Sequence, residues 1–127
     1  LKNRSYDRAR QFFEEAVTLN PHAAEYKALL GWATFLVDPN QYTAAAKIVL
    51  EAIRMDASLD RGYYFMGCIF KTRGDMVQAE NAYKKAASVN PKNIEALREL
   101  RLLEMRRESE EPSSSPKKGF FDRFKKS

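Results

Sequence analysis

The sequence predicts an all-α fold in which antiparallel helix hairpins stack as a solenoid of about two and a half repeats plus a closing helix. The first observation is a spacing of seven residues between alanines in three segments. These alanines are Ala9, Ala16, Ala45, Ala52, Ala79 and Ala86. The second observation is a glycine, Gly31 or Gly67, in the segment before each of the last two alanine pairs. Residues this small let two helix backbones come close, which indicates paired helices.

Large apolar residues surround these small ones at helical spacing. They are Phe13, Val17, Leu30, Trp32, Met66, Phe70, Tyr83 and Val89. Residues three or four apart share one side of a helix, so the pattern predicts a buried seam in each segment. We expect helices over residues 5–19, 22–36, 39–55, 58–72, 75–89 and 92–109.

Turn residues separate these helices in order. Asn20-Pro21 ends the first helix and opens the second, and Asp38-Pro39 places an N-cap and a first-turn proline before the third. Gly74-Asp75 supplies a left-handed helix end followed by an N-cap, and Asn90-Pro91 opens the last helix. The tripeptide Arg73-Gly74-Asp75 is therefore predicted to be a tight turn and not an adhesion motif.

One complete unit, from Asp60 to Asn93, carries aromatic, small and proline residues in a fixed order. They are Tyr63, Met66, Gly67, Phe70, Ala79, Tyr83, Ala86 and Pro91. The unit resembles the tetratricopeptide repeat family, whose period is about 34 residues. When this pattern is extended to the rest of the chain, it predicts one helical domain over residues 1–109. The domain consists of the second half of a repeat (1–23), a repeat with an insertion near Asp38 (24–59), the full repeat (60–93) and the closing helix (94–109). Ala57 replaces the closing proline of the middle repeat.

The resemblance implies a binding groove, because the first helix of each such repeat lines an inner concave surface. The positions that would point into it are Glu25, Ala28, Trp32, Phe35, Arg61, Tyr64, Cys68, Lys71, Glu95, Arg98, Leu102 and Met105. Trp32 and Tyr64 are the expected anchors for a partner segment. An alternative for Trp32 is packing between adjacent repeats. The Lys and Asn clamp of the chaperone-binding branch is absent, since Ala28, Tyr64, Trp32 and Cys68 hold the corresponding positions.

Composition argues against catalysis and against cofactors. Cys68 and His22 are the single residues of their kinds, so no zinc set is expected, and no neighbour in the sequence is placed to activate the thiol. The glycines are scattered and form no phosphate loop. We therefore expect no enzyme activity, no cofactor and no metal. The longest apolar stretch, residues 63–70, is far below the roughly 20 residues that a membrane span needs.

Residues 110–127 are predicted to form a flexible linker and a basic, phenylalanine-rich tail. Residues 112–127 hold five cations against Asp122 alone, which accounts for +4 of the chain's net charge of +5. The tail residues expected to contact a membrane or a partner are Lys117, Lys118, Phe120, Phe121, Arg123, Phe124, Lys125 and Lys126. Three alternatives remain open: anionic lipid contact, docking into a protein groove, and an inert solubilising end. The tail is similar in composition to the ends of some bacterial cytosolic proteins, and the opening half repeat suggests a C-terminal fragment.

These observations favour a cytoplasmic protein-interaction module that acts as a scaffold or adaptor by holding a peptide or helix in its groove. The alternative is a membrane-peripheral assembly factor at the inner membrane, tethered by the tail. Nucleic-acid binding is not expected, because the helical body is nearly neutral. Self-association is a further expectation, since Phe12, Phe13 and Val17 lack the partner helix of their half repeat.

Overall fold

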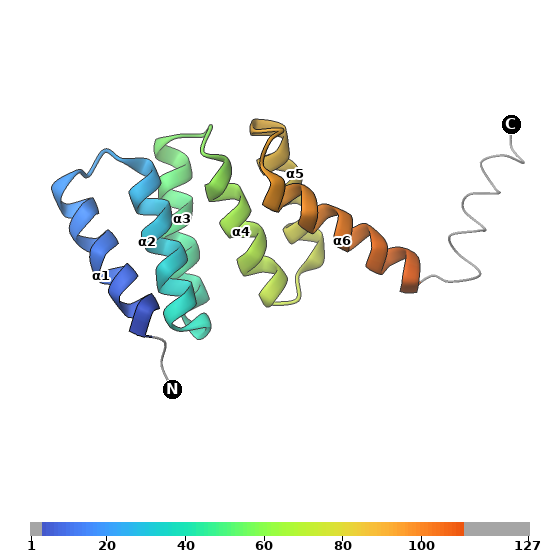
Figure 1. The fold of residues 1–127 in the computed structure, drawn as a ribbon, viewed down its shortest axis with the longest axis horizontal. Coiled ribbons are helices and arrows are strands. Elements are labelled where there is room, and N and C mark those ends of the chain that lie inside the picture. The colour runs from blue at the N-terminus through green and yellow to red at the C-terminus, as the bar shows by residue number, and fades with distance from the viewer. Residues whose placement is uncertain (1–3, 111–127) are drawn as a thin grey trace, which may run out of the picture.

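The computed structural model describes residues 4–110, which form successive antiparallel helix pairs (Figure 1). The elements are α1 (Arg4–Leu19), α2 (Ala24–Val37), a short 3-10 helix η1 (Pro39–Gln41), α3 (Tyr42–Met55), α4 (Asp60–Thr72), α5 (Met76–Val89) and α6 (Ile94–Glu110). Within this range there is no strand. The predicted fold class, an all-α solenoid of helix hairpins, is confirmed.

The helices lie in two layers. In Figure 1, α2, α4 and α6 stand in front of α3 and α5. The closest pairs are the hairpins α2–α3 and α4–α5, while α1 packs on α2 and α6 packs on α5. Helix α2 also contacts α4, which joins the two hairpins. We call the surface formed by α2, α4 and α6 the front face, and the surface formed by α3 and α5 the back face.

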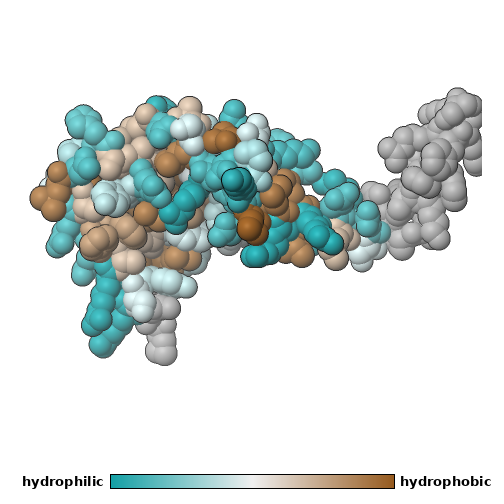
Figure 2. All heavy atoms as spheres, turned by 45° about the horizontal axis from the view of Figure 1, so that its top comes forward, coloured by the Kyte–Doolittle hydropathy of each residue, from teal (hydrophilic) through white to brown (hydrophobic). Residues whose placement is uncertain are grey.

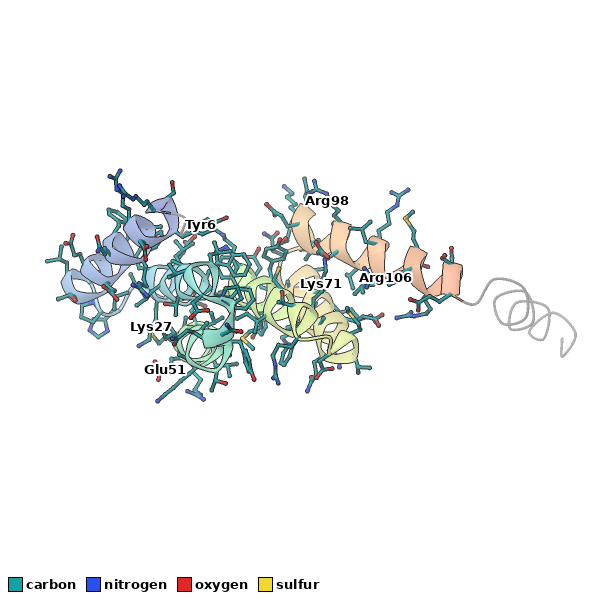
Figure 3. The ribbon with its side chains drawn as sticks, turned by 90° about the horizontal axis from the view of Figure 1, so that it is seen from below. Tyr6, Lys27, Glu51, Lys71, Arg98 and Arg106 are labelled. Atoms are coloured by element: carbon teal, nitrogen blue, oxygen red, sulfur yellow. The ribbon has the colours of Figure 1, made fainter. Side chains whose placement is uncertain are left out.

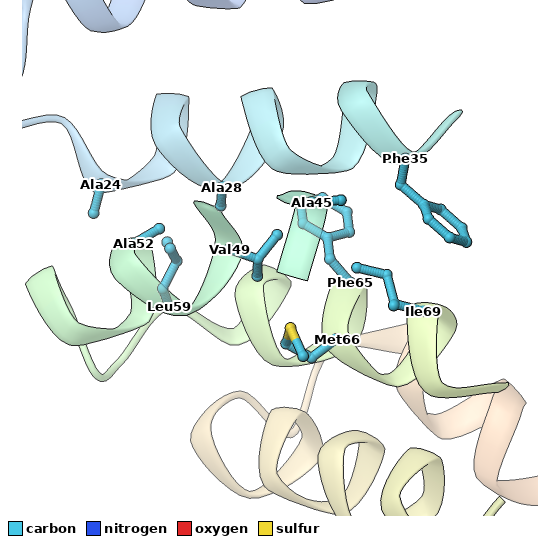
Figure 4. Packing of buried hydrophobic residues seen from close by; sticks show 10 residues of the cluster. All are labelled: Ala24, Ala28, Phe35, Ala45, Val49, Ala52, Leu59, Phe65, Met66 and Ile69. Atoms are coloured by element: carbon cyan, nitrogen blue, oxygen red, sulfur yellow. The ribbon is translucent and has the colours of Figure 1, made fainter. Parts of the chain in front are cut away.

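Small residues bring the paired helices together, as the alanine spacing predicts. Ala28 of α2 faces Ala45, Val49 and Ala52 of α3 across the seam, and all four side chains are fully buried (Figure 4). A Cβ atom added at Gly31 would lie 2.6 Å from the Cγ2 atom of Val49. The hairpin therefore needs glycine at this position, because any side chain would push the two helices apart.

The second hairpin uses the same device. A Cβ atom on Gly67 would overlap the ring of Tyr83, which is fully buried. Tyr83 belongs to a second core cluster with Ala79 and Leu103, and this cluster attaches α6 to α5. Burying a large aromatic side chain is worth roughly 1.5–3 kcal/mol, so this ring is a main contact between the hairpin and the closing helix.

Several helices begin later than the sequence predicts. The expected starts at 22, 58 and 92 become 24, 60 and 94, because a short turn precedes each helix. The carbonyl groups of Asn20, Asp56 and Asn90 accept hydrogen bonds from the amides three residues on, at 3.1, 3.1 and 2.9 Å. The next two residues are thereby held in the turn. The third helix also starts later than 39, since Pro39–Gln41 form η1 and α3 begins at Tyr42.

The turn between α4 and α5 is as predicted. Gly74 has a φ of +86°, a left-handed conformation that costs glycine no steric energy. The Asp75 carboxylate then caps α5 by accepting a hydrogen bond from the amide of Gln78 at 3.1 Å. The tripeptide at this position thus serves as a helix end and a helix start.

The surface of the helical body carries apolar and polar side chains in small groups, as the face in Figure 2 shows. Helix α1 has no buried residue, and Phe12 and Leu19 are 60% and 86% exposed. Phe13 and Val17 are half-buried. The residues expected to form the basic tail, Lys117–Lys126, lie outside the described residues, so the three alternatives for that segment stay predictions.

Candidate functional site

A hollow of about 470 Å³ opens on the front face, where α2, α4 and the start of α6 meet. Its lining comes from three helices and from the turn before α6: Trp32, Asp60, Arg61, Tyr64, Phe65, Asn90, Lys92, Asn93 and Glu95. The two expected anchors, Trp32 and Tyr64, thus lie on the same side of the molecule and share one cavity. Charged and amide side chains surround the two aromatic rings in this lining.

The indole of Trp32 forms part of the wall between two repeats. It stacks on Phe65 of α4, with ring centroids 4.9 Å apart, and on Phe35 of its own helix, with centroids 5.7 Å apart. The side chain remains half-buried. A face of the indole thus packs between repeats while the side chain also lines the hollow, and its role as an anchor for a partner stays a prediction.

The carboxylate of Asp60 organises the base of the hollow. One oxygen accepts hydrogen bonds from the side-chain amides of Asn90, at 3.0 Å, and Asn93, at 2.8 Å. Asn93 is only 6% exposed, and its own side-chain oxygen caps α6 by accepting from the Ala96 amide at 2.9 Å. Through these bonds the first residue of α4 fixes the first turn of α6, which sets the distance between two walls of the hollow.

Two ion pairs cross the front face between neighbouring repeats. Arg61 donates to Glu25 at 2.7 Å, and Lys71 donates to Glu99 at 2.7 Å. The first pair is about half exposed at both ends, so it adds little stability, on the order of 0–1 kcal/mol. The second lies deeper, and Figure 3 shows Lys71 between α4 and α6. Ion pairs thus connect α2 to α4 and α4 to α6 across this face.

Deeper in the same layer, a thiol and two phenols form a hydrogen-bonded group. Tyr83 donates to the Cys68 sulfur at 3.5 Å, and Tyr64 also hydrogen-bonds to it. Burial raises the pKa of the Cys68 thiol, although the hydrogen bonds from the two tyrosines partly oppose this. Burial also raises the pKa of both tyrosines above the ordinary range. All three groups are therefore neutral near pH 7, and Cys68 is a poor nucleophile there.

Two of the residues predicted to line the groove, Ala28 and Phe35, are instead buried in the core. Ala28 is fully buried and Phe35 is 5% exposed, so both belong to the core that α2 shares with α3 and α4. The methyl group of Ala28 does not reach past its larger neighbours. Phe35 is drawn inward by its stacking on Trp32. Neither side chain can contact a partner on the front face.

Of the four groove residues predicted on α6, one lines the hollow and three lie outside it. Glu95 lines it, whereas Arg98, Leu102 and Met105 do not. Leu102 and Met105 are 48% and 54% exposed. Figure 3 shows Arg98 on the outer side of α6, away from Lys71. The structure therefore brings together only part of the expected set, at the end of the groove where α4 and α6 begin.

Sequence reasoning missed Phe65, Asp60, Asn90, Lys92 and Asn93. The sequence signals for the turn residues were present, since Asn90 precedes a proline and Asn93 precedes the last helix. They were interpreted only as helix boundaries. No local signal marks Phe65, because its partner Trp32 lies one repeat earlier in the chain.

Residues 4–110 contain no cluster of histidine, cysteine or acidic side chains arranged to hold a metal ion. No helix within the same range is both long enough and apolar enough to cross a bilayer.

The comparisons with known proteins point to one family. A model of the tetratricopeptide repeat matches residues 1–22 and 60–93. These two segments therefore carry tetratricopeptide repeat sequence. The middle repeat, 24–59, lies outside the matched residues, yet α2 and α3 form a hairpin of the same kind. This segment departs from the repeat pattern by its insertion near Asp38 and by Ala57 in place of the closing proline.

Two solved repeat structures are similar to this one. The crystal structure of MamA shares 28% identity with a TM-score of 0.64, over 76% of this chain and 56% of the MamA chain. The chain thus spans little more than half the length of MamA. The first tetratricopeptide repeat domain of human RPAP3, solved by NMR, shares 21% identity with a TM-score of 0.69, over 85% of this chain and 84% of that domain. At this identity the likeness to RPAP3 shows the fold alone. Among curated proteins no sequence matches the chain.

The repeat that the chain matches has a general function. Tetratricopeptide repeats serve as protein-interaction and scaffolding modules, and they are generally not catalytic.

Proposed function

We propose that this repeat protein is a scaffold or adaptor that captures a segment of a partner protein on its front face. The observation that supports this most strongly is the shared hollow of Trp32 and Tyr64. These are the two residues expected from the family resemblance to anchor a partner segment on the concave surface. Aromatic rings that remain half-exposed in a cavity are typical anchors of a protein interface.

The lining of the hollow suggests the chemistry of the partner segment. The Trp32 and Tyr64 rings offer an apolar contact for one large side chain. Lys92 and Glu95 lie at the edge, and neither forms a salt bridge within the described residues. A segment with one aromatic or aliphatic anchor and charged residues on either side of it fits this arrangement. A segment that presents only a terminal carboxylate does not, because the hollow offers no pair of Lys and Asn side chains free to clamp it.

We place this interaction in the cytoplasm, as the single cysteine and the absence of a disulfide framework favour a reducing compartment. A tether to the inner membrane through residues 117–126 is the alternative function, and it depends on a segment outside the described residues. Sedimentation with anionic vesicles, with and without residues 117–127, separates the two.

Pull-down experiments test the front-face proposal directly. The native chain is compared with Arg61→Glu and Lys92→Glu, two exposed positions in the lining whose exchange leaves the core intact. Tyr26→Ala is the control, since Tyr26 is 39% exposed on α2 but does not line the hollow. Proteins recovered by the native chain and by Tyr26→Ala, but lost with both charge exchanges, support the proposal. Recovery of the same proteins by all four chains contradicts it.

A further inference from the structure

The back face carries a second, separate depression, which runs between α3 and α5. It consists of two adjoining hollows of about 400 and 360 Å³ that share Leu50, Met66 and Phe70. Met66 and Phe70 of α4 form the floor, and Leu50 of α3 forms one wall. We call this depression the back furrow.

The back furrow is distinct from the front hollow because it uses the opposite side of α4. Successive residues in a helix are about 100° apart, so Met66 and Phe70 project away from Arg61 and Tyr64. Residues of the front hollow come from α2, α4 and α6, whereas the furrow draws on α3, α4 and α5. The two surfaces can therefore be occupied at the same time.

Charge on the rim of the furrow has a single sign. Four cationic side chains line it, Lys47, Arg54, Arg73 and Lys85, and the residues that line the two hollows include no carboxylate. None of the four forms a salt bridge recorded within residues 4–110. Lys27 of α2 lies 3.0 Å from the Glu51 carboxylate and is the main cause of its lowered pKa. Lys47 and Arg54 make smaller contributions to that lowering.

Two of these cations are held in place by aromatic rings. The Arg73 guanidinium lies 4.0 Å from the centroid of the Tyr42 ring, and the Lys85 ammonium lies 5.8 Å from that of Tyr63. Cation–π contacts of this kind position a charge without neutralising it. The furrow thus combines an apolar floor with a positive rim that lacks counter-charges from its own lining.

We propose that the back furrow is a second docking site, for an acidic amphipathic segment of a partner protein. The segment would place large apolar side chains over Leu50 and Phe70 and direct Asp or Glu side chains toward the rim. Charge complementarity selects this occupant. The chain's own residues 117–126 carry five cations against Asp122, so the rim repels them. A flat anionic bilayer meets the rim but does not reach the floor of a furrow.

A designed peptide tests this proposal on the full 127-residue chain. The probe is a fluorescein-labelled amphipathic helix with leucines along one face and glutamates on both flanks, and its binding is measured by fluorescence anisotropy. We expect saturable binding that weakens as salt is added. Leu50→Asp should weaken it about tenfold or more, since Leu50 is 41% exposed and lines both hollows.

Controls distinguish this site from the others. Val77→Asp introduces the same charge at a position of α5 that is 72% exposed and outside the furrow, so it should leave binding unchanged. Lys92→Ala removes an exposed side chain from the lining of the front hollow and should also leave it unchanged. The proposal is overturned if a peptide with lysines in place of the glutamates binds equally well, or if Lys92→Ala abolishes binding while Leu50→Asp does not. It is also overturned if phosphatidylserine vesicles bind through Leu50 while the peptide does not.

Discussion

The indole ring of Trp32 lies parallel to the ring of Phe65, with centroids 4.9 Å apart and planes within 6° of each other. This contact joins α2 to α4, and therefore one repeat to the next. Because Trp32 also lines the front hollow, packing between repeats holds the proposed anchor in place before any partner arrives. A pre-organised anchor loses less conformational entropy on binding.

Gly67→Ala should lower the free energy of unfolding by about 1–3 kcal/mol, because the added methyl group overlaps the buried Tyr83 ring. Urea unfolding measures the change. Gly74→Asn is the control, since its surroundings are open and asparagine tolerates the left-handed backbone at this position. Equal stability of Gly67→Ala and the native chain would show that the α4–α5 seam is not close-packed.

Asp60→Ala should destabilise the chain by about 1–3 kcal/mol, because two side-chain amides lose their acceptor and Asn93 is buried. The loss should fall on the attachment of α6, so amide hydrogen exchange of the first turn of α6 should accelerate. Asp60→Asn keeps one acceptor oxygen and should cost less. Unchanged exchange in Asp60→Ala would mean that this carboxylate does not fix α6.

Because the Cys68 thiol is held in its neutral form by burial, we expect the free energy of unfolding to decline at alkaline pH. Burial holds its folded-state pKa above the ordinary value, so its contribution is fully present below about pH 8.5. As the pH rises further, the unfolded chain releases this proton first, and the free energy of unfolding falls until the folded thiol also ionises. Denaturant unfolding across this range should show a steeper decline for the native chain than for Cys68→Ala. Parallel declines would contradict the assignment.

We expect the protein to self-associate through helix α1 in a concentration-dependent manner. This helix has no buried residue, and Phe12 is 60% exposed. Sedimentation velocity should detect dimers, and Phe12→Ser should weaken them about tenfold, since a large apolar side chain leaves the contact. Gln11→Ser alters the adjacent exposed position and is the matched control. A native chain that stays monomeric at every concentration would rule this association out.

The fold follows from the sequence because its determinants are local and repeated. Alanines seven apart and a glycine on the facing helix specify a close crossing wherever they occur, as Gly67 and Tyr83 show. Helix starts were less predictable. The two residues after Asn20 and the two after Asn90 lie in a short turn, so each helix begins later than expected. The hydrogen bond that closes each turn cannot be recognised from the sequence pattern.

Helical position predicted a lining residue only where the side chain is long enough to reach the hollow from the helix. Tyr64 and Ala28 hold equivalent positions in successive repeats, yet the tyrosine reaches the hollow and the alanine is buried. Phe65 was missed because its role comes from Trp32, which is distant in sequence. The back furrow was missed as well, since it arises only where α3 and α5 are brought side by side over α4.

The central claim is that a partner segment binds in the front hollow between α2, α4 and α6. The most direct measurement selects binding peptides from a randomised library and maps the selected peptide on the chain by NMR chemical-shift changes. Trp32 is the single tryptophan, so its indole signal is unambiguous. We predict that this signal shifts together with the amides of Arg61, Tyr64 and Glu95. Shifts confined to α1, or to α3 and α5, with an unmoved indole signal would contradict the claim.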